Sequence, residues 1–509
     1  MNNELKAGVC INYVSIVIRL STQFFLTPYI ILKLGVDQYG LFMLSNSVIA
    51  WLSLTDFGLG ATVSKYVVTY RAKNQNDQQA HFLGQSIMLF TVLGLLTCLC
   101  GIVCYFYLDR FFPTLDSEQY DTLKILYLLT LSNLILAFPL RPLGCVPGAY
   151  QKFVVPGLVG LATSLLNAAL TVMLLYMGYK AIGLTVLGVV LGVLGLLWGA
   201  FYTCHCLSAK VIFKKPDFTL YREMFSFSFW VFLNQIMDLF YWRAGAPILA
   251  RVSGAEAVTL FTLGISFTQY FVTASTAVSS VFSPKLMQMV AIGSDSNELT
   301  TMMIRVGRFQ LFVLMIIILV FSFFGQDFLK LWVGKSIGGN IFIVWLGALI
   351  VLIPMVVPLT QNTGISILQA LNIHKGRAVI LFYTSLICVI IGYILSSFFS
   401  VIGMFIATCL ANVIGQNILI NIYYSKRAGL GIMRFFKIAF LPFLIPLIIT
   451  LFVGCLLILN LTLSNWFDLL LYMSLYALVC FFLFAFLYFR VDERRFIWGL
   501  FNFFSKNKK

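Results

Sequence analysis

Charged side chains are scarce in this sequence. Only 10% of its 509 residues are Asp, Glu, Lys or Arg, whereas 61% are hydrophobic. A soluble globular domain carries about a quarter of its residues as charged side chains, so this composition excludes a soluble globule. The mean hydropathy of +0.96 indicates a polytopic membrane protein instead.

The sequence also lacks the patterns typical of disulfide frameworks and metal sites. Its 11 cysteines are an odd number, and no predicted outer loop holds a pair, so no disulfide framework is expected. Cys204, His205 and Cys206 are adjacent, but no further ligands at metal-site spacing accompany them. We therefore expect no metal and no other cofactor.

Signals for catalysis or ATP use are weak as well. Residues 334–336 read Gly-Lys-Ser, like the end of a phosphate-binding loop, yet Leu329 stands where the first Gly of such a loop belongs. The longest predicted outer loop, near 109–122, is acidic but short. The first apolar run has no small-residue cleavage site, so we expect an uncleaved first helix. The sequence does not predict an enzyme.

Long apolar runs recur along the whole chain. Runs of about 20 residues can cross a bilayer as helices, whereas an outer-membrane barrel shows shorter segments of alternating polarity. The sequence predicts an all-α polytopic membrane protein with about fourteen transmembrane helices. The predicted spans are 9–31, 41–63, 83–108, 123–147, 154–176, 182–206, 224–249, 257–283, 308–328, 341–367, 378–398, 401–424, 438–460 and 467–489.

Basic residues set the predicted orientation, because Lys and Arg accumulate in short cytoplasmic loops. With the N-terminus inside, they concentrate in inner segments such as 65–73, 210–222 and 426–437 and in the tail 490–509. Few fall in the outer loops: Lys33, Arg110, Lys124, Lys180, Arg251, Lys330 and Lys335. Both termini are therefore predicted to be cytoplasmic. The net charge of +16 follows from this topology and does not indicate nucleic-acid binding.

The chain contains a weak internal repeat. The shift that aligns Pro28 with Pro247 also aligns Gly35 with Gly254, Asp37 with Glu256, Leu41 with Leu260 and Ser47 with Ser266. Because both copies begin inside, the sequence predicts two pseudo-symmetric six-helix bundles in parallel orientation. We place the first lobe at 1–222, the second at 223–437, two extra spans at 438–489 and a basic cytoplasmic tail at 490–509.

Five charged residues interrupt the predicted spans: Arg19, Asp56, Arg141, Asp238 and Arg243. Five such charges facing lipid would together cost on the order of 10 kcal/mol. We therefore expect them to line an interior. Under the repeat, Arg19 aligns with Asp238, so this pair could switch partners between two states or permanently pin the lobes together.

Neutral polar residues accompany these charges. Gln23 lies on the face of Arg19, and Asn234 and Trp242 lie on that of Asp238. Further stripes occur in later spans and fit either a wet interior or simple helix packing: Gln269, Thr273, Thr276 and Ser280; Gln361, Asn362 and Thr363; Asn412, Gln416 and Asn417.

Several motifs resemble the Wzx-type polysaccharide flippases of the multidrug, oligosaccharidyl-lipid and polysaccharide exporter superfamily. The resemblance covers essentially the whole chain, and its motifs are loose and hydrophobic. The residues that carry it are Pro28, Leu34, Gly35, Tyr39, Gly40, Leu41, 56–60, Lys65, Tyr66, 139–152, 229–254, Gln369, Asn372 and Lys375.

The resemblance implies two six-helix bundles followed by two further spans, and a cargo of oligosaccharide linked to undecaprenyl pyrophosphate. It implies a bacterial inner-membrane protein of O-antigen or capsule synthesis that works by alternating access, possible partners being a glycan polymerase and a chain-length regulator. Guanidinium groups grip phosphate well, so Arg19, Arg141 and Arg243 are the candidate phosphate ligands. Asp56 and Asp238 are then candidates for charge balance or ion coupling.

Other interpretations stay open at this point. Asp56 could stabilise the inner end of its helix, and Arg141 could extend to the membrane surface. A cation-coupled multidrug exporter would share the architecture but would need an acidic cavity. An integral-membrane glycan polymerase or glycosyltransferase would process the same cargo.

Overall fold

The computed structural model describes residues 3–459 and 465–489, and this part of the chain contains helices and no β-strand. The predicted tail at 490–509 lies outside the described residues. The α-helices are α1 Asn3–Leu34, α2 Val36–Leu52, α3 Leu59–Ala72, α4 Asn76–Phe111, α5 Ser117–Ala149, α6 Val154–Tyr176, α7 Ala181–Phe201, α8 Phe218–Trp242, α9 Gly245–Ser253, α10 Ala255–Ala291, α11 Ser296–Trp332, α12 Gly334–Ile337, α13 Ile341–Thr360, α14 Asn362–Ala370, α15 His374–Asn412, α16 Ile420–Ala428, α17 Ile432–Phe435, α18 Leu444–Leu459 and α19 Trp466–Leu487.

The helices confirm the predicted all-α, multi-pass membrane fold. Within the described residues, 11 helices are long and apolar enough to cross a membrane, or up to 12 if a bent pair counts as one span, so the number fourteen is not confirmed. One of the 11, His374–Ala428, has 55 residues and is kinked at Ser400, where φ is 49°. That kink lies at the predicted boundary between spans 378–398 and 401–424.

The helices group into two compact units. Residues up to Thr262 form the first unit together with Ser385–Ala407, and the remaining described residues form the second. Helix α8 therefore groups with the seven α-helices that precede it. The predicted lobes at 1–222 and 223–437 stay a prediction.

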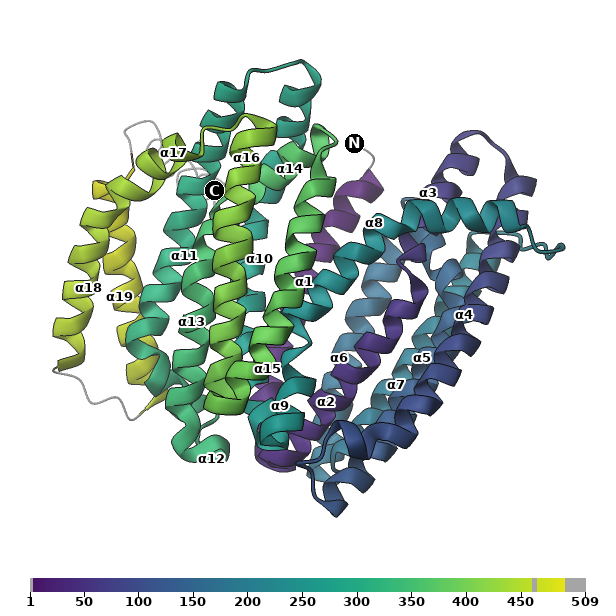
Figure 1. The fold of residues 1–509 in the computed structure, drawn as a ribbon, viewed down its shortest axis with the longest axis horizontal. Helices are drawn as coiled ribbons and strands as arrows, with labels where there is room; N and C mark the ends of the chain where they lie inside the picture. Colours follow the sequence, from purple (N-terminus) through teal and green to yellow (C-terminus); the bar gives the residue numbers. More distant parts are fainter. Residues whose placement is uncertain (1–2, 460–464, 490–509) are drawn as a thin grey trace, which may run out of the picture. The chain divides into compact units, whose positions relative to one another are not determined.

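The first unit is organised around an apolar core shared by α3, α4, α5 and α8 (Figure 1). Helix α8 crosses α3 at close range, since the Thr62 and Ser228 hydroxyls lie 2.5 Å apart. Lys65 places its ammonium 3.7 Å from the centre of the Phe227 ring. These contacts hold α8 against the helix that follows Asp56.

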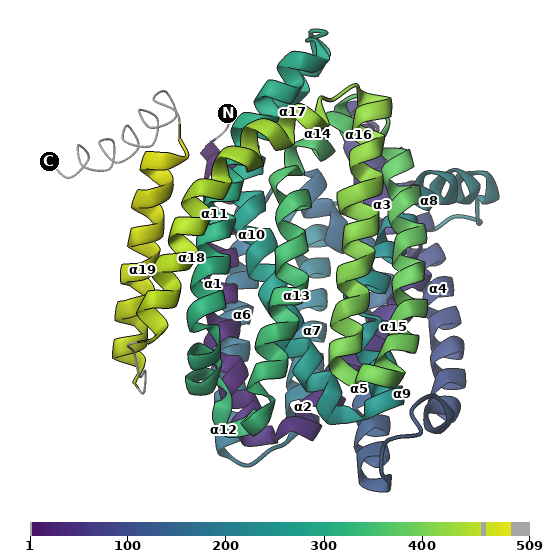
Figure 2. The same cartoon turned by 60° about the vertical axis from the view of Figure 1, so that its left-hand side comes forward.

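In the second unit, α18 and α19 lie side by side in both views (Figures 1 and 2). The Tyr476 hydroxyl of α19 donates to the Thr450 carbonyl of α18 over 2.8 Å. Gly454 of α18 packs on the Phe323 ring of α11, so closely that a larger residue would overlap the ring. The final helix pair is thus fixed to the rest of this unit.

The two turns related by the sequence repeat have the same backbone conformation. Gly35 joins α1 to α2 with φ 85°, and Gly254 joins α9 to α10 with φ 86°. Both values are in the region that only glycine adopts readily. The Thr259 hydroxyl donates to the Val36 carbonyl over 2.7 Å, so the two turns meet inside the first unit.

Prolines inside the long helices free carbonyl groups that neighbouring helices then satisfy. Pro147 cannot donate to Leu143, and the Leu143 carbonyl instead accepts from the Thr203 hydroxyl at 3.0 Å. Pro358 likewise frees the carbonyl of Pro354, which accepts from the Asn417 amide at 3.0 Å. Inside a membrane such groups have no water partner, so these bonds stabilise the two helices.

Candidate functional site

An ion pair joins α5 to the break that follows α2 in the first unit. Arg141 of α5 donates through Nη1 to Oδ2 of Asp56 over 2.6 Å. The Arg141 and Asp56 side chains are 30% and 14% exposed, so the pair is not fully buried in the protein. The Arg141 guanidinium also lies 4.9 Å from the centre of the Phe138 ring. Two charges predicted as separate candidates are thus direct partners.

Asp56 also stabilises a break in the backbone. The segment Ser53–Asp56 is a 3-10 turn, and Phe57 and Gly58 that follow have φ of 49° and 69°. Oδ1 of Asp56 accepts from the Gly58 amide over 2.9 Å. The chain then continues as α3, bent by 44° from the preceding segment. One carboxylate therefore serves both the break and the ion pair.

The sequence explains why the chain breaks at this place. Asp accepts readily from a backbone amide two residues ahead, and Gly tolerates the left-handed conformation without steric cost. Gly58 also permits close contact with α8, because a Cβ there would lie 2.9 Å from a Val231 methyl. Phe57 packs against the Phe232 ring of α8, with ring centres 5.0 Å apart.

The other candidate residues lie on α1 and at the end of α8. Arg19, Gln23, Asp238 and Arg243 are exposed, while Asn234 and Trp242 are partly buried. None is sealed inside the protein, as a role in binding requires. Whether Arg19 and Asp238 exchange partners stays a prediction.

Arg243 stands at an interruption that the sequence did not predict. The predicted span 224–249 divides into α8 and α9, and Arg243 is the residue that follows α8. The amides of Arg243 and Ala244 both donate to the Leu239 carbonyl. An arginine at such an interruption has more freedom of direction than one inside a helix, which suits a ligand-binding role.

Several polar side chains of the second unit form hydrogen bonds with one another. The Gln310 amide donates to the Ser275 hydroxyl over 2.9 Å, and Asn362 donates to the same hydroxyl over 3.0 Å. Gln361 donates to Asn421 over 2.8 Å. Gln310, Gln361 and Ser275 are at most 1% exposed. These groups join helices to one another. The polar stripes of the later spans fitted either a wet interior or helix packing, and for Gln361 and Asn362 the structure favours helix packing.

The sequence reasoning missed Gln310 as part of this network. It lies in the apolar stretch of α11, where a single amide gives no periodic stripe. In contrast, Gln269, Thr276 and Ser280 of α10 are exposed, so the stripe there faces away from the packed interior. The useful signal for Gln310 was its isolation, because a lone amide in an apolar helix needs a partner on another helix.

Comparisons with known proteins identify the family. The model of a family described as polysaccharide biosynthesis protein matches residues 5–290, which are more than half of the chain. The chain belongs to this family. A curated relative, the putative O-antigen transporter of Salmonella typhimurium, is 27% identical over 184 residues, which are 34% of this chain and 40% of that protein.

Two solved transporter structures have a fold similar to that of this chain. The lipid II flippase MurJ in an inward closed conformation aligns with 94% of this chain and 98% of its own, with a TM-score of 0.74 and 16% identity. An inward-facing multidrug resistance MATE transporter of the MOP superfamily aligns with 83% and 99%, with a TM-score of 0.60 and 13% identity. The resemblance to Wzx-type flippases that the sequence predicted is confirmed. The protein is a multi-pass membrane protein with this transporter fold.

Proposed function

We propose that this protein is a flippase that moves undecaprenyl-pyrophosphate-linked oligosaccharide repeat units from the inner to the outer leaflet of a bacterial cytoplasmic membrane. The observation that carries the proposal is membership of the polysaccharide biosynthesis family. The MurJ-like fold over nearly the whole chain supports it. Alternating access is the mechanism, because sugars and phosphates cannot cross hydrocarbon unaided, whereas the polyprenyl tail stays in the lipid.

The pyrophosphate of the cargo would be held by arginines. Arg19 and Arg243 are exposed and permanently charged, and a guanidinium can bind phosphate oxygens through two parallel hydrogen bonds. Arg141 has a different role in this proposal, because its guanidinium already forms an ion pair with the Asp56 carboxylate. A phosphate oxygen that takes the place of the Asp56 carboxylate would release Arg141 from Asp56, which would couple cargo binding to a change of partners.

Neutral candidates would bind the sugars. Gln23 and Asn234 carry amides that both donate and accept hydrogen bonds, as hydroxyl-rich rings require. Trp242 offers an apolar ring face and one N–H donor. Asp238 would balance the charge of the arginines or bind a coupling ion.

Cellular context follows from the same proposal. Both termini would be cytoplasmic in the bacterial inner membrane, in agreement with the distribution of basic residues in the loops. A glycan polymerase and a chain-length regulator would act on the delivered units. The observed fold is shared with drug exporters, but three arginines against two aspartates among the candidates favour an anionic cargo.

The proposal is tested by replacing the free arginines in a strain that depends on this protein for its surface glycan. We expect Arg19→Ala with Arg243→Ala to reduce surface glycan more than tenfold and to cause lipid-linked repeat units to accumulate inside. Arg110→Ala is the matched control, because Arg110 is also exposed but lies at the end of α4 outside the candidate set. Normal glycan with both arginines replaced, at normal protein abundance, would refute the phosphate-binding role.

A further inference from the structure

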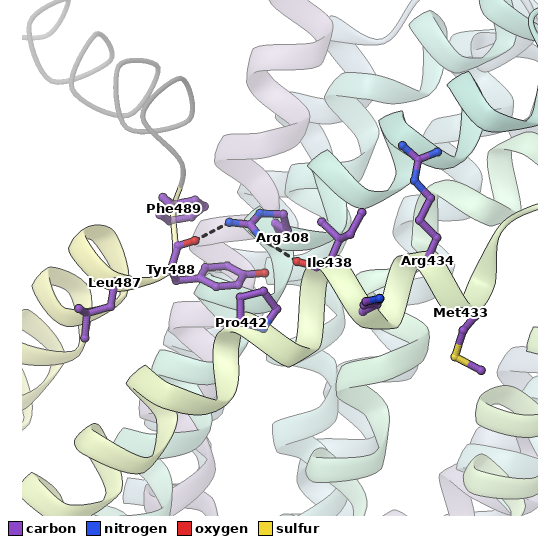
Figure 3. A pocket seen from close by; sticks show the side chains of 9 residues that line it. Arg308, Met433, Arg434, Ile438, Pro442, Leu487, Tyr488 and Phe489 are labelled. Atoms are coloured by element: carbon purple, nitrogen blue, oxygen red, sulfur yellow. Dashed lines mark hydrogen bonds between the residues drawn. The ribbon is translucent and has the colours of Figure 1, made fainter.

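A second polar site lies in the second unit, far along the chain from the candidate residues. It is a pocket of about 800 Å³ at the place where α11, the segment from α17 to α18 and the end of α19 meet (Figure 3). Its lining residues are Arg308, Met433, Arg434, Lys437, Ile438, Pro442, Leu487, Tyr488 and Phe489. Nothing in the proposed flippase mechanism uses this pocket.

Arg308 lines the pocket, and hydrogen bonds to two backbone carbonyls fix its guanidinium. It is 3% exposed, and it donates to the carbonyl of Ile438 over 2.8 Å and to that of Tyr488 over 2.5 Å. Its guanidinium lies 4.1 Å from the centre of the Tyr488 ring (Figure 3). Tyr488 caps the carboxyl end of α19, where carbonyl groups lack helical partners and favour a cation. Arg308 therefore shapes the pocket.

The accessible charge of the pocket comes from two other residues. Arg434 and Lys437 are both exposed, and no Asp or Glu is among the described residues that line it. In Figure 3, Ile438 separates Arg434 from Arg308. A neighbouring pocket of about 400 Å³ shares Arg434 and adds Lys285 and Arg305, with Glu298 as its acid. The whole region is strongly basic.

The predicted topology places the pocket at the level of the lipid headgroups of the inner leaflet. It lies where α18 begins and α19 ends, and the predicted topology places this end on the cytoplasmic side. The lining combines basic side chains with the apolar side chains of Pro442, Leu487 and Phe489. A phospholipid presents the same two chemistries, a phosphate next to hydrocarbon. Basic pockets between spans on the cytoplasmic side are typical binding places for anionic headgroups.

We propose that this pocket binds the headgroup of an anionic phospholipid of the inner leaflet. The lipid phosphate lies between Arg434 and Lys437, and the first part of an acyl chain lies on Leu487 and Pro442. Arg308 is a positioning residue, since its donors already serve two carbonyls. This binding does not depend on the cargo of the flippase.

Binding of defined lipids to the purified full-length protein in a zwitterionic detergent tests the proposal. Phosphatidylglycerol should raise the melting temperature in a saturable way, while phosphatidylcholine with the same acyl chains should not. Arg434→Gln with Lys437→Gln should weaken the apparent affinity for phosphatidylglycerol by about 25-fold, since each basic residue near an anionic membrane contributes about fivefold. Lys426→Gln with Arg427→Gln removes the same charge from exposed residues of α16 and should keep the wild-type affinity.

Three results would overturn the proposal. Equal stabilisation by phosphatidylcholine would show that the headgroup charge is irrelevant. An equal loss of affinity in the control variant would assign the effect to general surface charge. Full stabilisation by sodium phosphate or pyrophosphate alone would assign the site to a free anion rather than to a lipid. Because the readout is lipid binding, it remains decisive even if the glycan cargo is assigned wrongly.

Discussion

Two segments that align under the sequence repeat behave differently in the structure. The alignment of Pro28 with Pro247 also sets Asp56 opposite Ser275, and Phe57 and Gly58 opposite Thr276 and Ala277. Near Asp56 the helix breaks and bends by 44°. Near Ser275, α10 continues from Ala255 to Ala291 as one helix of 37 residues. The residue pair at the break accounts for the difference, since only one copy has a Gly with a preceding carboxylate to hold the turn.

Asp56 and Ser275 also differ in the side chains and backbone groups that they contact. Arg141, which pairs with Asp56, aligns with Thr360, and the bonds of Ser275 reach Leu359 and Asn362 on either side of that position. One contact is ionic and partly exposed, while the other is neutral and buried. Full burial of an ion pair carries a large desolvation cost, which a neutral hydrogen bond largely avoids. The comparison leads us to expect a role in transport for the charged contact of the first copy and a role in packing for the neutral contact of the second.

The largest expected effect comes from the ion pair. Asp56→Asn combined with Arg141→Gln removes both charges and leaves no unpaired ion, so the melting temperature should change little. Surface glycan should fall more than tenfold if the pair takes part in transport. The measurement is the amount of surface glycan, normalised to the abundance of the variant protein in membranes. Undiminished glycan in the double variant would mean that the pair only holds α5 to the break.

The second effect concerns the break itself. Gly58→Ala places a Cβ 2.9 Å from the Val231 methyl in a left-handed backbone conformation. Strain and overlap together should reduce the free energy of unfolding by roughly 2–3 kcal/mol. Thermal unfolding of the purified Gly58→Ala and wild-type proteins measures this loss of stability. A variant as stable as the wild type would show that the break is not tightly packed against α8.

A smaller effect is expected at the aligned serine. Ser275→Ala removes the acceptor of Gln310 and Asn362 in a buried site, which should cost about 1–2 kcal/mol. Glycan export per folded molecule should stay at the wild-type level. The same unfolding assay and the same glycan assay apply. Lost export in a stable Ser275→Ala protein would contradict the assignment of this network to packing.

The smallest effect should come from copying the glycine of the first copy into the second. Ala277 is exposed in the middle of α10, so Ala277→Gly should cost about 1 kcal/mol of helix stability without causing a break. Comparison of its melting temperature with that of Gly58→Ala gives the contrast directly. A larger loss at Ala277 than at Gly58 would reverse the comparison.

Much of the fold could be predicted from sequence, but the partners of polar residues could not. Asp56 and Arg141 were both recognised as costly charges inside spans, yet they are 85 residues apart, and no local pattern relates them. Arg308 is the first residue of the predicted span 308–328, and its burial could not be predicted because it results from packing against the end of α19. The break between α8 and α9 was not predicted, because the apolar residues on both sides of Arg243 together have the length of one span, 224–249.

By itself, the sequence determined that the chain is helical, crosses a membrane many times and belongs to its family. These properties follow from length and polarity, because hydrocarbon forces each backbone to satisfy its own hydrogen bonds within a helix. Only the tertiary structure decided which charge meets which, since side chains from distant spans come within hydrogen-bond range only when helices pack. It likewise decided that the amides of the second unit join helices and that Arg308 shapes a pocket.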